Sequence, residues 1–156
     1  MSTFTMENPV FVIYLVCSAI MVLKVMGQGW MTVYRMMSTH SGFASPEDLQ
    51  KGALNPDPHP DQLALNDYVD RSRRMHHNDL ENIPAFWAVG LLYVATSPSY
   101  ALAASLMVGF VAARLIHAVV YATEQSHEVR ATFYTIGSLI VMAMAVSVLY
   151  AAWQVL

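Results

Sequence analysis

The chain has 156 residues, of which 56% are hydrophobic and only 12% are charged. Soluble domains contain about 25% charged residues, so this composition indicates a membrane protein rather than a water-soluble domain. The net charge of −3 excludes the global positive field that favours nucleic acid binding. The single cysteine, Cys17, excludes an intramolecular disulfide and a cysteine-rich zinc site. The length suits one membrane domain over residues 1–156.

Hydropathy along the chain predicts four transmembrane helices, at residues 9–37, 66–97, 100–123 and 129–155. The second is the least obvious, because its apolar part begins only at Ile83. The fifteen residues from Ile83 to Ser97 form a helix about 22 Å long, which is shorter than the roughly 30 Å thickness of the hydrocarbon core. The helix therefore needs the polar turns that precede Ile83. We expect an all-α, integral membrane four-helix bundle.

The connections between these helices differ in length and charge. A polar loop at residues 38–65 joins the first two helices, and its Ser45-Pro46 pair predicts the start of a short surface helix. Residues 55–60 contain three prolines and are typical of an extended, turn-rich linker. The other two links are short, which makes successive helices antiparallel neighbours. Basic residues gather on the side of the long loop, so the positive-inside rule makes that loop cytoplasmic and places both termini on the opposite side.

Polar side chains inside the predicted helices recur at helical spacing. A charge within a membrane helix costs at least ~2.5 kcal/mol and is a functional-site candidate by default. On the second helix, residues three or four apart share one face; they are Arg71, Arg74, Asn78 and Glu81, flanked by Arg73 and His77. The other three helices carry similar stripes, formed by Lys24, Gln28 and Arg35, by Arg114, His117 and Tyr121, and by Arg130 and Tyr134.

Converging arginines with asparagine, glutamate, histidine and tyrosine suit a small anion with carboxylates and a free amine. Arginine binds carboxylates through two parallel hydrogen bonds. Glu81 is suited to receive an ammonium group and Asn78 a peptide amide. Glutathione has all of these groups, although a nucleotide or a phospholipid headgroup also satisfies the same side chains.

Purely structural roles compete with ligand binding for several of these residues. Arg35, Arg71 and Arg73 are placed to reach lipid phosphates at the membrane interface. Arg114 and Glu81 could form a structural ion pair, whereas Asp79 is expected to pair with a basic neighbour such as Arg114. Adjacent histidines without a carboxylate or cysteine set do not make a zinc site, so no metal is expected.

The run from Arg71 to Ile83, RSRRMHHNDLENI, closely resembles the MAPEG family, the membrane-associated proteins in eicosanoid and glutathione metabolism. Its glutathione transferase branch is the most similar and its prostaglandin E synthase branch the next. Further matching positions run in the family order from Lys24 to Tyr134; they include Tyr34-Arg35, residues 43–48, Ala113-Arg114 with His117 and Tyr121, and Arg130.

This resemblance implies a homotrimer that binds glutathione between neighbouring subunits near the cytoplasmic face. Arg130 would lie beside the glutathione thiol as the catalytic residue. Carried over by position, the residues in contact with glutathione would be Arg35, Arg73, Arg74, His77, Asn78, Glu81, His117, Tyr121, Arg130 and Tyr134. The implied activity is conjugation of glutathione to small hydrophobic electrophiles in detoxification, with possible reduction of lipid hydroperoxides. The membrane would be the bacterial inner membrane or the endoplasmic reticulum, depending on the source.

Departures from the family pattern bear on the activity. Ala131 follows Arg130 where the prostaglandin synthases have a serine, and this favours conjugation over prostaglandin isomerisation. His77 occupies a position that is basic in the synthases and apolar in some transferases, and Pro84 falls one residue earlier than the usual proline. The alternatives are a glutathione-dependent isomerase like prostaglandin E synthase and a non-catalytic lipid-binding scaffold.

Overall fold

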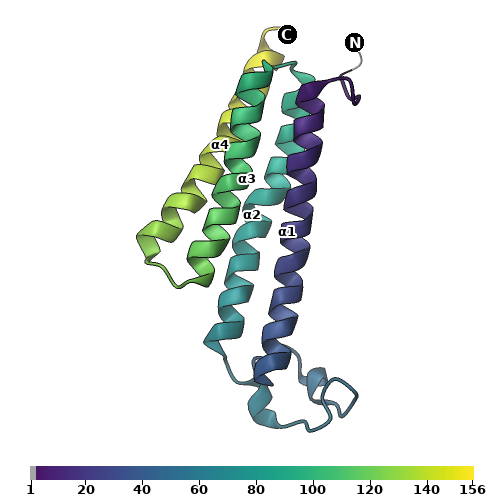
Figure 1. Ribbon diagram of the computed structural model, residues 1–156, viewed down its shortest axis with the longest axis vertical. Coiled ribbons are helices and arrows are strands. Elements are labelled where there is room, and N and C mark those ends of the chain that lie inside the picture. Colours follow the sequence, from purple (N-terminus) through teal and green to yellow (C-terminus); the bar gives the residue numbers. More distant parts are fainter. Residues whose placement is uncertain (1–2) are drawn as a thin grey trace.

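The computed structural model describes residues 3–156 of the chain. Its elements, in order, are α1 (Pro9–Thr39), η1 (Pro46–Leu49), η2 (Pro60–Leu63), α2 (Asp67–Ala95), α3 (Tyr100–Ala122) and α4 (His127–Trp153). Both termini lie at one end of the bundle, and the linker between α1 and α2 lies at the other (Figure 1). The expected all-α bundle of four long helices is confirmed.

Local capping explains where the helices begin. The Asn8 side chain accepts a hydrogen bond from the Val10 amide at 3.0 Å, with Pro9 at the first helical position. The Asn66 side chain accepts from the amides of residues 68 and 69 and starts α2. Ser126 caps α4 through the Val129 amide, so that helix begins at His127, two residues before the predicted start at residue 129.

Three of the four helices, α1, α3 and α4, are each long and apolar enough to cross a membrane. The 29 residues of α2 carry their charges in the amino-terminal half. This half lies against α1, and the two helices extend together past the turn between α3 and α4 (Figure 1). The first turns of α2, which extend past the α3–α4 turn, thus pack against α1 (Figure 1).

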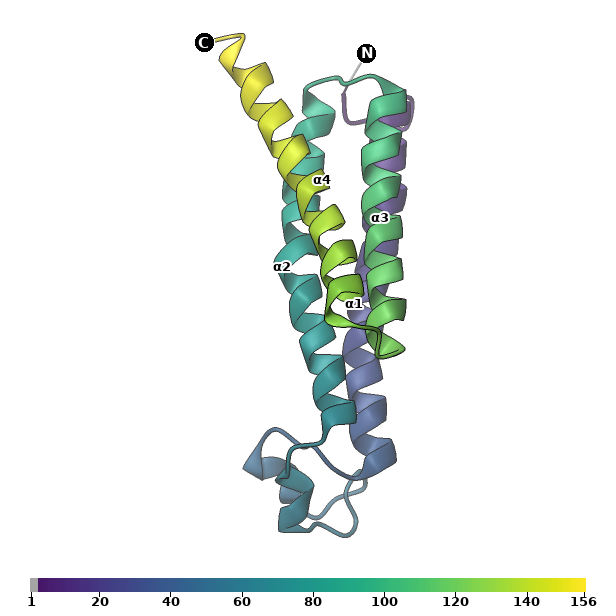
Figure 2. The same ribbon diagram turned by 90° about the vertical axis from the view of Figure 1, so that its left-hand side faces the viewer.

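The four helices are not packed symmetrically. Both α2 and α3 contact every other helix, whereas α1 and α4 do not contact each other within residues 3–156. Figure 2 shows α4 leaning away from α3 toward its carboxyl end. The described residues of α4 include only three buried ones, Gly137, Val141 and Met144, so most of its apolar surface is available to lipid or to another protein chain.

Aromatic side chains fill the apolar half of the bundle. Phe86 of α2 and Phe110 of α3 are both fully buried and stack with ring centroids 4.3 Å apart and planes 7° from parallel. On α1, the Tyr14 hydroxyl donates to the Trp87 carbonyl at 2.8 Å. Gly90 leaves the space for that tyrosine ring, since a Cβ there would lie 2.9 Å from Tyr14 Cε2. These contacts hold α1, α2 and α3 together above the charged region.

A buried charge cluster lies at the middle of the bundle. Asp79 of α2 accepts hydrogen bonds from Lys24 of α1 and from Arg114 of α3, the latter at 2.6 Å. Asp79 and Arg114 are completely buried. Arg114 also donates to the Asn78 carbonyl at 3.1 Å, and Gly137 of α4 makes room for its side chain. The expected pairing of Asp79 with Arg114 is confirmed, and the alternative pairing of Arg114 with Glu81 is wrong.

The linker is more ordered than its composition suggested. The predicted surface helix at Ser45-Pro46 is a single 3₁₀ turn, η1, in which the Asp48 carboxylate accepts from the Ser45 amide at 3.2 Å. A second 3₁₀ turn, η2, follows the prolines. The buried amides of Asn55 and Gln62 bond each other reciprocally, at 2.7 and 3.2 Å. These side-chain contacts were not apparent from the proline-rich sequence.

Replacing Asp79 by asparagine should strongly destabilise the fold, because it leaves Lys24 and Arg114 buried without a counter-charge. Removing one partner of a buried ion pair costs about 3–5 kcal/mol. The midpoint of unfolding in dodecyl sulfate mixed micelles, followed by circular dichroism, measures the loss. Asp61→Asn, at an exposed linker position, is the matched control and should leave the midpoint unchanged; equal midpoints for both variants would contradict the structural role of the cluster.

Candidate functional site

A hollow of about 270 Å³ opens between α2, α3 and α4 on the side of the bundle. It lies near the α3–α4 turn, and its lining combines aromatic, amide and charged groups. The lining residues are Asn78, His117, Tyr121, His127, Arg130, Ala131 and Tyr134. Five of these seven belong to the predicted glutathione contacts, and they come from three different helices.

Arg130 sits in the first turn of α4 at the edge of this hollow. Its Nε donates to the Ser126 carbonyl at 3.4 Å, and its guanidinium carbon lies 4.7 Å from the centroid of the Tyr121 ring. A guanidinium over an aromatic face is attracted by the negative charge of the π-system. No ion pair to Arg130 is present among the described residues. Its positive charge is therefore available to an anion in the hollow.

His117 and the two tyrosines form the back of the hollow. The His117 ring is buried, with its centroid 5.5 Å from that of Tyr121 and 6.2 Å from that of Tyr134. Its Nδ1 has no hydrogen-bond partner in the described structure. Burying such an atom without a partner costs free energy, which a polar ligand atom in the hollow can recover.

Glu81 is held at the α2 side of this group. The Tyr134 hydroxyl donates to Glu81 Oε2 at 2.9 Å, and His77 Nε2 lies 3.5 Å from Glu81 Oε1. The arrangement joins two predicted residues of α2 to one of α4. Because the Glu81 side chain is still 44% exposed, its carboxylate has capacity left to accept a further donor.

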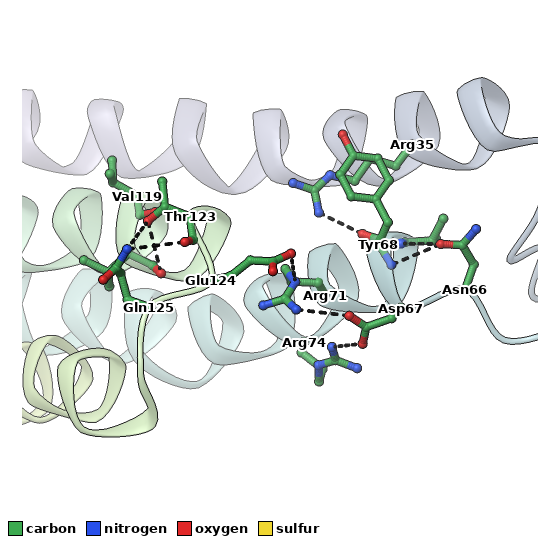
Figure 3. A network of polar contacts seen from close by, with 12 residues as sticks. Arg35, Asn66, Asp67, Tyr68, Arg71, Arg74, Val119, Thr123, Glu124 and Gln125 are labelled. Carbon is green, nitrogen blue, oxygen red and sulfur yellow. Dashed lines mark hydrogen bonds and ion pairs between the residues drawn. The ribbon is translucent and has the colours of Figure 1, made fainter.

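Arg74 lies on the same side of α2, next to the hollow. Its Nη2 donates to Asp67 Oδ1 at 2.8 Å, and it also interacts electrostatically with the Tyr121 phenol. Tyr121 thus interacts with the guanidinium groups of both Arg74 and Arg130. The bond from Arg74 to Asp67 is drawn in Figure 3.

The structure places Arg35 and Arg73 elsewhere. Arg35 of α1 donates to the Tyr68 carbonyl at 2.8 Å and lies over the Tyr68 ring, 4.2 Å from its centroid. Arg73 donates to Asp70 at 2.7 Å and to the Gly42 carbonyl of the linker. Both arginines tie α2 to α1 or to the linker, and neither lines the hollow.

The polar stripe expected on the first helix likewise joins α1 to α2. Gln28 donates to Ser72 Oγ at 2.8 Å, and Thr32 donates to the same oxygen at 2.9 Å. With Lys24 bound to Asp79, this stripe is buried against α2 instead of facing a ligand.

Inspection of the sequence missed His127 as part of the site. His127 is three residues before Arg130 on α4, so the two share a helix face, and this spacing was the available signal. The predicted start of the helix at residue 129 had left His127 in the preceding turn. Because Ser126 starts the helix two residues earlier, His127 instead lines the hollow.

Another hollow, of about 520 Å³, lies in the linker between residues 40 and 62. None of the predicted contact residues lines it. Within residues 3–156, no three histidine, cysteine, aspartate or glutamate side chains are grouped so that they could hold a metal ion. The smaller hollow beside Arg130 is therefore the one whose lining residues suit an anionic ligand.

Comparison with known proteins identifies the family of the chain. Microsomal glutathione S-transferase 1 from Bos taurus is 34% identical over 140 residues, covering 90% of this chain and 89% of the relative. The Homo sapiens protein of the same name is 32% identical over 143 residues, covering 92% and 91%. Prostaglandin E synthase from Bos taurus is 30% identical over 149 residues, covering 94% and 92%. The MAPEG family model matches residues 10–150, and this integral membrane protein belongs to the MAPEG family.

Proposed function

We propose that this protein is a membrane-bound glutathione transferase that joins glutathione to small hydrophobic electrophiles. Reduction of lipid hydroperoxides is proposed as a second activity of the same bound thiolate. The observation that carries the proposal is the Arg130 guanidinium above Tyr121, which has no carboxylate partner within residues 3–156, in a hollow that also presents Asn78 and His117. The relatives named microsomal glutathione S-transferase 1 support the choice of reaction.

Arg130 acts by favouring the ionised form of the glutathione thiol. A free thiol has a pKa near 8.5 and is mostly protonated at neutral pH, while an opposite charge within about 4–6 Å lowers such a pKa by about 1–3 units. The thiol proton passes to water. The thiolate then attacks the electrophilic carbon, a carbon–sulfur bond forms, and the leaving group departs with its bonding electrons.

Glutathione is proposed to contact two groups of residues. One group surrounds the hollow and comes from a single chain; it comprises Arg74, His77, Asn78, Glu81, His117, Tyr121, Arg130 and Tyr134. The other group consists of Arg35, which bonds the Tyr68 carbonyl of α2, and Arg73, which bonds the Gly42 carbonyl of the linker. We propose that these two arginines contact glutathione bound to a neighbouring subunit.

The assembly that brings neighbouring subunits together is proposed to be a homotrimer. The hollow is open on one side, and α4 beside it leaves its apolar surface largely uncovered. The electrophile, dissolved in the bilayer, would enter between subunits, so that both substrates meet at the lipid boundary. Native mass spectrometry of the protein released from detergent micelles should give three chains per particle. A monomer or a dimer as the main species would contradict this assembly.

The site is proposed to face the cytoplasm, in the bacterial inner membrane or the endoplasmic reticulum according to the source. The linker and the α3–α4 turn lie at the end of the bundle opposite the termini (Figure 1). The test uses Gly52→Cys in the linker and Ser99→Cys between α2 and α3, each with Cys17→Ala. When intact bacterial cells that carry the variants in their inner membrane are treated with an impermeant maleimide, Ser99→Cys should react and Gly52→Cys should react only after permeabilisation. The reverse pattern would invert the orientation.

A glutathione-dependent isomerase is the second candidate, because relatives named prostaglandin E synthase match 94% of this chain at 28–30% identity. Ala131 is the observation against it. It lines the hollow next to Arg130 and has no hydroxyl with which to assist the thiolate. A non-catalytic scaffold would bind fatty acid in the membrane and show no turnover with glutathione.

Replacing Arg130 by alanine should lower the conjugation rate about 10- to 1000-fold at neutral pH, because the thiol returns toward its ordinary pKa. Much of the glutathione binding should remain, since the other contacts persist. The rate of conjugation of 1-chloro-2,4-dinitrobenzene and the thiolate absorbance on glutathione binding measure the two effects. Raising the pH should restore part of the lost rate, because it supplies the thiolate without the arginine.

Lys51→Ala removes an exposed positive charge in the linker and is the matched control, which should retain the wild-type rate. The transferase proposal fails if the wild-type protein, reconstituted in lipid, neither binds glutathione saturably nor conjugates it. Fatty-acid binding without turnover would support the scaffold, and isomerisation of a prostaglandin endoperoxide without conjugation would support the synthase.

A further inference from the structure

The first two turns of α2 hold one aspartate between two arginines (Figure 3). Asp67 Oδ2 lies 3.0 Å from Arg71 Nη2, and Asp67 Oδ1 lies 2.8 Å from Arg74 Nη2. Each carboxylate oxygen is thus occupied by a different guanidinium. This group lies beside the candidate site, because Arg74 also interacts with Tyr121 of the hollow.

The two arginines differ in what else they touch. The Arg71 side chain is only 17% exposed, and its Nε lies 3.5 Å from Glu124 Oε1 in the α3–α4 turn. It therefore has carboxylates on two sides and joins α2 to that turn. The Arg74 side chain is 50% exposed and is paired with Asp67 alone among the carboxylates of residues 3–156. Only Arg74 has a guanidinium face free for a ligand.

We propose that Asp67 is a specificity-determining residue, an internal carboxylate that occupies Arg74 until a ligand carboxylate displaces it. The proposal rests on glutathione being the ligand, as argued above. A thiol without a carboxylate that reaches Arg74 cannot complete this exchange. Asp67 then stays paired with Arg71 and Arg74, and such a thiol gains no bond from the Arg74 guanidinium. Asp67 thereby selects ligands that bring their own carboxylate.

The strength of the contact suits a displaceable partner. Exposed ion pairs contribute little, equivalent to a factor of about 1.5 to 5 in an equilibrium constant. The carboxylate of a bound ligand offers Arg74 a charge-assisted bond of the same kind, while the other contacts of the site hold the rest of the ligand in place. Replacement of Asp67 by the ligand carboxylate is therefore favourable, but the affinity for the ligand is lowered by the strength of the Asp67–Arg74 bond that must be broken.

A purely structural role for Asp67 has the opposite consequence. If Asp67 served to orient Arg74 for the ligand, removing its charge would leave Arg74 mobile and weaken binding. If it competes with the ligand, removing the charge strengthens binding. The sign of the change in affinity thus separates the two roles.

The test is calorimetric titration of glutathione into the full-length protein in lipid nanodiscs, comparing wild type with Asp67→Asn. Asparagine keeps the size of the side chain and removes its charge. We expect the Kd to fall by about 1.5- to 5-fold. Asp61→Asn, which removes a charge from the exposed linker, is the matched control and should leave the Kd unchanged.

Two further measurements locate the effect. In an Arg74→Gln background, Asp67→Asn should not increase the affinity for glutathione, because Asp67 competes with the ligand for Arg74. The gain should also disappear for one of two analogues, glutathione monoethyl ester, which lacks the free glycine carboxylate, or the descarboxy form lacking the glutamyl α-carboxylate. If Asp67→Asn increases the affinity for both analogues, Asp67 acts only through its general negative charge, and the proposed selectivity is wrong.

An unchanged or higher Kd in Asp67→Asn, with wild-type binding and turnover intact, would overturn this inference alone. Absence of saturable glutathione binding in the wild-type protein would instead overturn the proposed function, and this inference with it.

Discussion

The buried carboxylate of Asp79 is the constraint on which the arrangement of the helices depends. It accepts from Lys24 of α1 and Arg114 of α3, so one side chain of α2 ties three helices together. Two basic side chains share this one buried carboxylate. Such a group is stable only while its geometry satisfies both donors. The cluster therefore sets the relative heights of α1, α2 and α3.

The candidate site inherits its geometry from this cluster. Arg114 donates to the carbonyl of Asn78, a residue that lines the hollow, and its guanidinium carbon lies 5.7 Å from the centroid of the Tyr134 ring. Tyr134 in turn donates to Glu81 of α2. The polar residues of α2 thus divide between two faces. Asp79 and Ser72 point into the bundle, while Asn78, Glu81 and Arg74 surround the site.

Much of the fold and part of the site could be predicted from the sequence. The fold was predictable because membrane-spanning helices appear in a sequence as long apolar runs. Spacing of three and four residues also placed Arg74, Asn78 and Glu81 on one face of α2. Spacing alone could not show that Arg73, which flanks this face, bonds Asp70 and the linker carbonyl of Gly42 instead of lining the hollow. That distinction depends on where the linker folds, and the linker is held by the buried amide pair of Asn55 and Gln62.

By itself the sequence determined the number of helices, the polar stripe on each and the family resemblance, because these depend on residue type and periodicity along one chain. Only the tertiary structure decided which stripe serves packing and which surrounds the hollow. The stripe of α1 is buried against α2 through Gln28 and Lys24, whereas that of α4 carries Arg130 over Tyr121. The physical reason is that a charged side chain in a bundle takes its role from its partner across the helix interface. That partner depends on how the helices pack, and the periodicity of a single helix carries no information about that packing.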